Sequence, residues 1–147
     1  MSQLLHLATE TDFDRLMPMV AAYHAEEGIE SDESHRAEAI RPLLQGSPLG
    51  AIWLIGPKMS PVGYVCACFG WSIELGGMDG FVDELWIREK VRGRGMGGDA
   101  LVALQKALSE AGLRALHLEI GDENPAERLY YRAGFRRRKF NLMTWMA

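Results

Sequence analysis

Residues 92–98 read Arg92-Gly93-Arg94-Gly95-Met96-Gly97-Gly98, with four glycines and two arginines in seven positions. The segment lies where the pattern of a strand gives way to the pattern of a helix. Glycine allows positive φ angles and a close approach of the backbone to a ligand, so successive N–H groups can converge on one anion. The helix that follows adds the positive end of its dipole. The sequence therefore predicts a phosphate-binding loop here.

Length and composition favour one small domain. The chain has 147 residues, 48% hydrophobic and 24% charged, which fits a single globular domain over residues 1–147. A net charge of −4 argues against nucleic acid or an anionic membrane as the partner. No apolar run approaches the ~20 residues of a membrane span and no signal peptide is evident, so we expect a cytoplasmic protein. The only cysteines, Cys66 and Cys68, suit neither a disulfide framework nor a four-ligand zinc site, so we expect no metal.

Hydrophobic periodicity and turn residues divide the chain into helices and strands without internal repeats or an evident linker. The predicted strands cover residues 4–8, 51–55, 61–73, 81–88 and 114–120, with one or two more between 135 and 146. The predicted helices cover about residues 12–27, 34–45, 97–111 and 124–133, and Gly112 and Gly134 end the last two. The strands between 51 and 88 form an antiparallel meander that turns at Gly76 and Gly77.

The glycine-rich segment has three other interpretations. Gly93, Gly95 and Gly98 match the G-x-G-x-x-G spacing of a dinucleotide site, with Glu119 where an acid would hold the ribose. That fold needs a series of parallel βαβ units, and fewer than 30 residues follow Glu119. A Walker A loop is excluded because no Gly-Lys-Ser/Thr sequence follows. A flexible surface turn without a ligand fits residues 92–98 taken alone.

A second motif downstream weighs against the surface turn. Arg92-x-x-Gly95-x-Gly97 after one strand, with Leu129-Tyr130-x-x-x-Gly134-Phe135 after the next, resembles the GNAT superfamily of acetyl-CoA-dependent N-acetyltransferases. The resemblance in motifs spans about residues 81–135, and the element order outside it agrees with that fold. It implies an α+β (α/β) fold, with a mixed, mostly antiparallel central sheet of six to seven strands flanked by about four helices.

The resemblance implies that acetyl-CoA is the acyl-donor cosubstrate and that the glycine-rich loop holds its pyrophosphate. Backbone N–H groups from Gly93 to Gly98, including that of Met96, would contact the phosphate oxygens. Arg92 and Arg94 add charge-assisted donors that a purely structural turn does not need. The physical interpretation of the loop and the resemblance therefore agree on an anionic ligand.

Two further segments are implied to contact the cofactor. The strand residues Leu85, Trp86 and Ile87 would pair with the pantetheine arm like an added strand and point one N–H at the thioester carbonyl. Family members usually place an asparagine seven residues before the tyrosine. Here that position is Glu123, and Asn124 lies six before the tyrosine. A shift of one residue in the loop would return Asn124 to the cofactor.

Acetyl transfer to an amine needs two proton movements. The amine, with a pKa near ~10.4, must lose a proton before it attacks, and the departing thiolate must gain one. The resemblance assigns the acid to Tyr130, while its neighbour Tyr131 points about 100° away around the helix. The identity of the general base is undecided, because Glu119, Asp83 and Glu84 each match an acidic position used in the family. Strict alternation along the strand predicts that Asp83 and Glu84 face opposite sides of the sheet.

The sequence constrains the acceptor least. Between Glu26 and Glu33 lie five acidic residues and no basic one, in the connection that by resemblance walls the acceptor pocket. A cationic amine would be attracted there, whether a small molecule, a protein lysine or a protein N-terminus. A solvated acidic loop is the alternative interpretation of this segment, and a non-catalytic acyl-CoA-binding module is the alternative function. A homodimer is compatible with a small domain that has edge strands.

Overall fold

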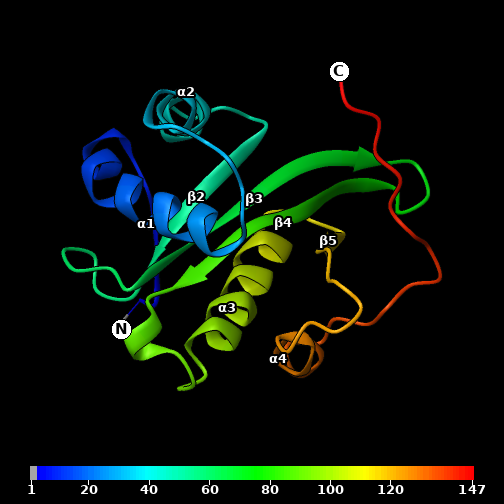
Figure 1. Cartoon of the computed structure of the whole chain (residues 1–147). Coiled ribbons are helices and arrows are strands. Elements are labelled where there is room, and N and C mark those ends of the chain that lie inside the picture. The colour runs from blue at the N-terminus through cyan, green and yellow to red at the C-terminus, as the bar shows by residue number, and fades with distance from the viewer. Residues whose placement is uncertain (1–2) are drawn as a thin grey trace.

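The computed structural model describes residues 3–147 (Figure 1). Its strands are β1 Leu5–Leu7, β2 Gly50–Ile55, β3 Gly63–Ser72, β4 Gly77–Ile87 and β5 Ala115–His117. Its helices are α1 Phe13–Glu26, α2 Glu33–Leu44, α3 Met96–Glu110 and α4 Glu127–Arg132, with short 3₁₀ turns at Glu10–Asp12 and Glu89–Val91. Within residues 3–147, no helix combines the length and the apolar composition needed to cross a membrane.

The strands form one mixed sheet in the order β1-β2-β3-β4-β5. Neighbours from β1 to β4 run antiparallel, and β5 runs parallel to β4. Antiparallel neighbours need only short turns, and Gly76 supplies the positive φ of +73° in the turn between β3 and β4. A parallel neighbour needs a longer crossover, which α3 provides between β4 and β5. The meander from β2 to β4 and the helix that follows it are confirmed.

Helices cover both faces of the sheet (Figure 1). Helices α1 and α2 pack on one face, in a core that includes the fully buried Leu16, Leu54 and Tyr64. Helix α3 packs on the other face, where Val65 and Leu104 are fully buried. Consecutive residues of β3 enter different cores because successive strand side chains point to opposite faces. The sheet therefore separates two apolar cores.

Two irregularities of β4 shape the molecule near its middle. Cys66 pairs with Glu84 and Ala67 with Val82, so Asp83 is an extra residue on β4, a β-bulge. Strands β4 and β5 pair only over residues 79–81 and 115–117. Within residues 3–147, the rest of β4 has no strand partner on that edge. The two parallel strands therefore separate beyond the bulge and leave backbone groups of β4 unpaired.

The strand count and the C-terminal tail differ from the prediction. Residues 3–147 form five strands rather than six to seven, and residues 135–147 contain neither a strand nor a helix. Strand β5 ends at His117, short of the predicted end at Ile120. A strand exists only where its N–H and C=O groups meet a neighbouring backbone. Side-chain patterns predict an extended segment, but they do not supply that neighbour.

Candidate functional site

A cleft of about 760 Å³ opens beside the unpaired half of β4. Its walls come from the end of α1, residues 85–87 of β4, the glycine-rich loop with the start of α3, and α4. Tyr130 and every predicted cofactor residue except Arg94 line it. These cofactor residues are Leu85, Trp86, Ile87, Arg92, Gly93, Gly95, Met96, Gly97, Gly98 and Asn124. The fold thus brings both sequence motifs to one cavity.

The glycine-rich loop presents its backbone to this cleft. Gly93 and Gly95 have φ angles of +79° and +78°, which residues with a side chain rarely adopt, and a Cβ at either would meet no atom within 4 Å. Within residues 3–147, no backbone carbonyl or side chain accepts a hydrogen bond from the N–H groups of residues 93–98. At Gly97 a Cβ would lie 3.3 Å from Leu129 Cδ1, so glycine lets α3 approach α4. Free donors at the start of a helix form an anion-binding geometry.

The open edge of β4 offers further backbone groups. Arg88 N–H donates to Val62 O at 2.7 Å. This bond shows which residues of β4 direct their backbone groups toward β3. In an antiparallel ladder, alternate residues direct their backbone groups away from the partner strand. Leu85 and Ile87 therefore point theirs toward the open edge. The carbonyl of Ile87 accepts from Arg92 Nε at 2.7 Å, which agrees with a carbonyl that points away from β3.

The side chain of Arg92 is held by the cleft walls. Its Nη2 lies 2.7 Å from Glu26 Oε1, an ion pair between the loop and the last turn of α1. The hydrogen bond from Arg92 lowers the pKa of the Glu26 carboxyl. This carboxylate also accepts from the indole N–H of Trp86. Arg94 is exposed and lies outside the cleft lining, so the two predicted arginine donors have different surroundings.

Tyr130 lies on α4 and reaches into the cleft, where it is half-buried. Its ring meets that of Phe135 edge to face at 6.3 Å, which restricts its orientation. Burial, followed by the charge of Glu27, raises the pKa of the Tyr130 phenol, so it stays protonated at neutral pH. Tyr131 is 54% exposed and stacks under the guanidinium of Arg136 at 4.1 Å. Only the first tyrosine of the pair contacts the cleft.

Glu84 is the centre of a hydrogen-bond network on the face of the sheet that α1 covers. Its Oε2 lies 2.7 Å from His24 Nε2, and its Oε1 accepts from Tyr64 OH at 2.7 Å. His24 Nδ1 lies 2.7 Å from Ser31 Oγ in the connection between α1 and α2. Burial, followed by the charge of Glu84, raises the pKa of Tyr64, which therefore donates as a neutral phenol. The network pairs a carboxylate with an imidazole, the groups that proteins use to move protons.

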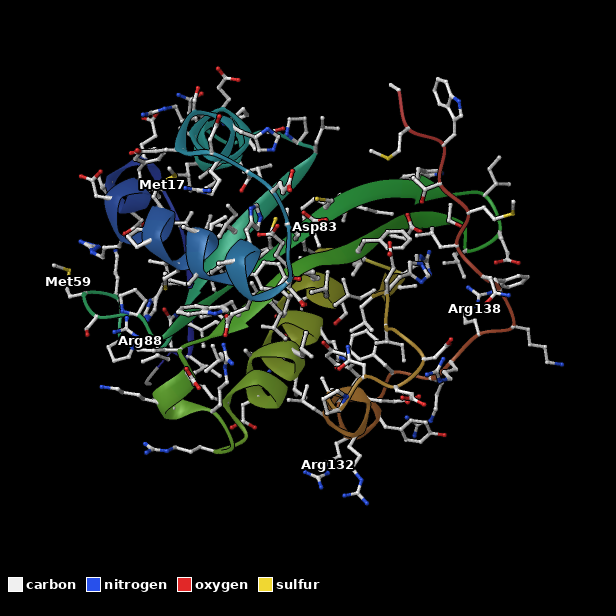
Figure 2. The ribbon with its side chains drawn as sticks, in the orientation of Figure 1. Met17, Met59, Asp83, Arg88, Arg132 and Arg138 are labelled. Atoms are coloured by element: carbon white, nitrogen blue, oxygen red, sulfur yellow. The ribbon has the colours of Figure 1, made fainter. Side chains whose placement is uncertain are left out.

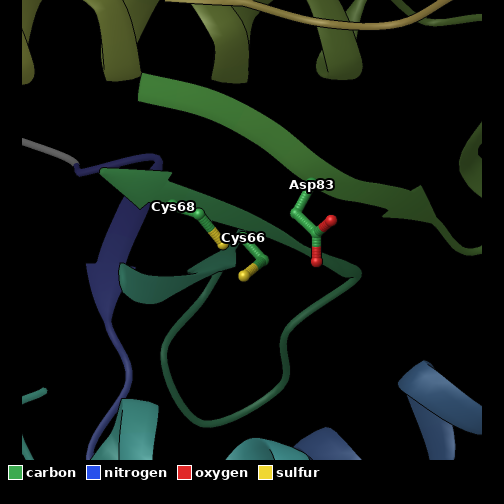
Figure 3. Close-up of side chains that lie close together, drawn as sticks. All are labelled: Cys66, Cys68 and Asp83. Atoms are coloured by element: carbon green, nitrogen blue, oxygen red, sulfur yellow. The ribbon is translucent and has the colours of Figure 1, made fainter. Parts of the chain in front are cut away.

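Asp83 lies on the same face as Glu84, so the prediction of opposite faces is wrong. Its carboxylate and the thiols of Cys66 and Cys68 lie within 4.8 Å of one another (Figure 3), and both cysteines contact the core beneath α1 and α2. The bulge adds one residue to β4 and shifts the alternation after it. The hydrogen bond with Cys68, together with burial, raises the pKa of the Cys66 thiol. The same hydrogen bond lowers the pKa of the Cys68 thiol.

The remaining two predicted site residues occupy different positions. Glu119 is exposed in the segment after β5. None of the three predicted base candidates, Asp83, Glu84 and Glu119, lines the cleft itself, although Glu84 directly precedes the lining residue Leu85. Asn124 does line the cleft, and its Oδ1 accepts from Ala126 N–H at 2.8 Å. Asn124 therefore also stabilises the entry to α4.

Sequence analysis missed the positions of Tyr23 and His24 on α1. Tyr23 lines the cleft together with Glu27, which follows the helix and belongs to the predicted acidic segment, and His24 contacts Glu84. Burial, followed by the charges of Glu27 and Glu84, raises the pKa of Tyr23 to about 12. The phenol of Tyr23 therefore senses the charge of Glu27 in the cleft and the charge of Glu84 on β4. In sequence it resembles the core residues on the same helix face, such as Leu16, and only its spacing to Glu27 was a signal.

Comparison with known proteins agrees with this geometry. Residues 7–135 match the model of the acetyltransferase (GNAT) family, and the chain belongs to that family. A search of curated proteins finds no sequence match to this chain.

Solved structures share the fold over nearly the whole chain. An integron cassette protein from the mobile metagenome of Cole Harbour Salt Marsh is 31% identical, with 97% of this chain and 90% of that chain covered and a TM-score of 0.86. A probable acetyltransferase is 18% identical, with coverages of 99% and 98% and a TM-score of 0.85. AAC(6')-Iy, solved with the bisubstrate analog CoA-S-monomethyl-acetylneamine, is 14% identical, with 97% of each chain covered and a TM-score of 0.78.

Proposed function

We propose that this protein is an N-acetyltransferase that transfers an acetyl group from acetyl-CoA to a primary amine by direct attack. One observation carries the proposal: the free N–H groups of residues 93–98, the open edge of β4 and the phenol of Tyr130 line the same cleft. Acetyl-CoA, when bound, supplies the activated acyl group. The chain supplies binding, orientation and proton transfer.

The donor fits the cleft through backbone groups. The N–H groups of residues 93–98 and the positive end of α3 would bind the pyrophosphate. The outward groups of Leu85 and Ile87 would pair with the amides of the pantetheine arm, as an added strand does. Arg92 bonds the Ile87 carbonyl in this structure, so the arm would reach that carbonyl once Arg92 turns toward the phosphates. The N–H of Leu85 is then the donor that would stabilise the oxyanion.

Glu84 is the carboxylate that we assign as the base. The ammonium group of the acceptor would give one proton to Glu84, directly or through a water molecule, and Asp83 on the same face would attract the cation. The free amine then forms a bond to the thioester carbon. His24 Nε2, 2.7 Å from Glu84 Oε2, would hold the carboxylate in place. This arrangement uses both acids on one side of the sheet.

Tyr130 is the acid that we assign to the departing sulfur. When the tetrahedral intermediate collapses, the C–S bond breaks and the thiolate takes the phenolic proton. The nitrogen loses its remaining extra proton to solvent, Glu84 releases its proton to solvent, and solvent restores the phenol. A raised pKa keeps the phenol protonated until the thiolate forms.

The surroundings of the proposed acceptor side favour a cation. Asp83 and Glu84 share one face, Glu27 lines the cleft, and the segment from Glu26 to Glu33 has five acidic residues and no basic one. An amine on a small molecule, a lysine side chain or a protein N-terminus satisfies this chemistry. The CoA-linked analog bound to AAC(6')-Iy supports the idea that this fold holds a donor and an amine together.

A panel of amines with release of free thiol as the readout tests the function. We expect turnover with at least one cationic amine and a fall in kcat of about 10²-fold or more in Tyr130→Phe, the usual contribution of a general acid. Tyr131→Phe is the matched control and should keep the parent rate, because that ring lies outside the cleft. An unchanged rate in Tyr130→Phe would remove the assigned acid. Thermal stabilisation by CoA without turnover of any amine would favour the non-catalytic acyl-CoA-binding module.

A further inference from the structure

Three side chains that can bind a metal ion meet on the face of the sheet that α1 and α2 cover. The thiol sulfurs of Cys66 and Cys68 and a carboxylate oxygen of Asp83 lie within 4.8 Å of one another (Figure 3). Asp83 lies near the middle of the sheet, away from the tail at Arg138 and the loop at Met59 (Figure 2). None of the three residues lines the cleft. The proposed acetyl transfer gives no role to the two thiols.

The two strands place these groups by alternation and by the bulge. Cys66 and Cys68 are two residues apart on β3, so both side chains point to one face of the sheet. Asp83 is the extra residue of β4, opposite the step from Cys66 to Ala67. The bulge turns its carboxylate toward the face that carries the thiols. The spacing of the cysteines thus gives two of the three groups, and the pairing of β3 with β4 adds the third.

Asp83 differs from the other two acids of β4, because Asp79 and Glu84 each meet a histidine, at 3.2 Å and 2.7 Å. Within the part of the chain that the structure describes, no histidine, lysine or arginine forms an ion pair with Asp83. Asp83 is exposed and Cys68 is half-buried, so an ion can reach the cluster from solvent. The carboxylate is therefore free to bind a cation.

We propose that Cys66, Cys68 and Asp83 bind one divalent cation of the Zn²⁺ class, with a water molecule as the fourth ligand. Three protein ligands and one open position form a known arrangement for Zn²⁺, which accepts both thiolate and carboxylate. With a Zn–S distance of about 2.3 Å, two sulfur ligands of a tetrahedral ion lie about 3.8 Å apart. A separation of at most 4.8 Å therefore has to close by no more than about 1 Å.

The charges of the site balance in the same way. On binding, each thiol releases its proton to solvent and forms one sulfur–metal bond. The cation offsets the two thiolate charges, including that of the buried Cys66. Asp83 adds one further negative charge at the exposed side of the site, where water can solvate it. The site would also link β3 to β4 across the bulge.

Titration of the full chain with Co²⁺, a spectroscopic substitute for Zn²⁺, tests this site. A phosphine reductant keeps the thiols reduced. One Co²⁺ per chain should then produce a sulfur-to-cobalt charge-transfer band, which Zn²⁺ should abolish by displacement. The chain has no other cysteine, so this band can come only from Cys66 and Cys68. Zn²⁺ should also raise Tm because it binds the folded state, and neither readout depends on acetyl transfer.

Two conservative variants and a matched control assign the ligands. Cys68→Ser and Asp83→Asn should each weaken Co²⁺ binding by about 10²-fold or more, since even the loss of a group that orients a ligand costs about 10–100-fold. Neither side chain is fully buried, so both variants should keep the parent circular dichroism. Asp79→Asn makes the same chemical change at the acid that pairs with His117 and should keep the parent affinity.

Four results would overturn the site. The first is a reduced parent protein that gives no charge-transfer band with Co²⁺. The second is one Co²⁺ per two chains, since two copies would then share the ligands. The third is the parent affinity in Asp83→Asn, because the carboxylate would then not bind the metal. The fourth is an equal loss in Asp79→Asn, which would attribute the effect to the net charge of β4.

Discussion

Asp83 shows how one residue can decide which groups share a site. Without the bulge, β4 would alternate strictly and would place Asp83 and Glu84 on opposite faces. With it, both carboxylates lie on the face that α1 covers, where Glu84 meets His24 at 2.7 Å. The bulge also lies where β4 loses its partner β5, next to the backbone edge that lines the cleft. One local irregularity therefore places both acids on one face of the sheet, next in sequence to the open edge, although neither acid lines the cleft itself.

The role of Glu84 is the first prediction at this scale. Glu84→Gln removes the charge but keeps the shape and an acceptor for Tyr64 OH. We expect kcat to fall by about 10²–10⁴-fold, the usual contribution of a general base, with the fold intact by circular dichroism. Glu119→Gln makes the same chemical change at an exposed residue outside the cleft and should leave kcat and KM at parent values. If kcat falls in Glu119→Gln and not in Glu84→Gln, the general base is Glu119 and the assignment of Glu84 is wrong.

The connection between β4 and α3 shows how an element boundary becomes a binding site. The 3₁₀ turn Glu89–Val91 ends β4, and the glycines that follow turn the chain into α3. Gly93 and Gly95 have positive φ angles, and the N–H groups of residues 93–98 take part neither in the strand ladder nor in the helical hydrogen bonds. Arg92 fastens this loop to α1 through Glu26 and to β4 through the Ile87 carbonyl. Two elements, α1 and β4, therefore hold the loop through Arg92, and the N–H donors of the loop stay free.

Substitutions in this loop should separate backbone strain from packing. Gly95→Ala places a side chain at φ +78° with no clash, so the cost is the strain of the left-handed region, about 1–2 kcal/mol. A loss of 1 kcal/mol lowers Tm by about 2–4 °C in a domain of this size, and the stabilisation by CoA should shrink as well. Gly98→Ala is the control: its Cβ would lie 3.8 Å from Leu129 Cγ, an ordinary contact, and alanine favours the helix by up to about 1 kcal/mol. Equal losses of Tm in both variants would argue against strain as the cause.

At the scale of the whole molecule, buried phenols couple stability to pH. Tyr64 is fully buried between the sheet and α1, and its pKa is raised by burial and by Glu84. The pKa of Tyr23 is raised to about 12. Because these pKa values exceed the value of about 10 in the unfolded chain, the unfolded state loses its protons first as pH rises. The stability that these phenols contribute is complete below about pH 10 and is lost as pH rises through 12.

Thermal unfolding between pH 9 and pH 12 measures this coupling. The parent protein should lose Tm steeply above about pH 10, and Tyr64→Phe should lose it less steeply because one buried titrating group is gone. Tyr64→Phe also loses the hydrogen bond to Glu84, so its Tm at pH 7 should be lower, and the slope is the informative quantity. Tyr131→Phe at the surface should keep the parent slope. Identical slopes in the parent and in Tyr64→Phe would show that other groups cause the alkaline loss.

Local sequence was enough for features that depend on neighbours in the chain. The glycine-rich loop was predicted because a positive φ angle depends on the type of a single residue, and Gly93 and Gly95 both have positive φ angles. The helices and the meander were predicted because burial on one face imposes a period on the side chains. Tyr130, which lines the cleft, was predicted from a motif that lies within one short helix and its stop, and its role as the acid stays a prediction.

Tertiary structure decided the features that depend on distant backbone and on charge. The bulge at Asp83 depends on how β3 and β4 align, and the network of Glu84, His24 and Tyr64 depends on where α1 lies on the sheet. The tail from residue 136 has the pattern of a strand, but its backbone pairs with no other segment within residues 3–147. A residue's type and spacing state which local conformation it favours, whereas pairing and proximity arise only when segments far apart in the chain pack together.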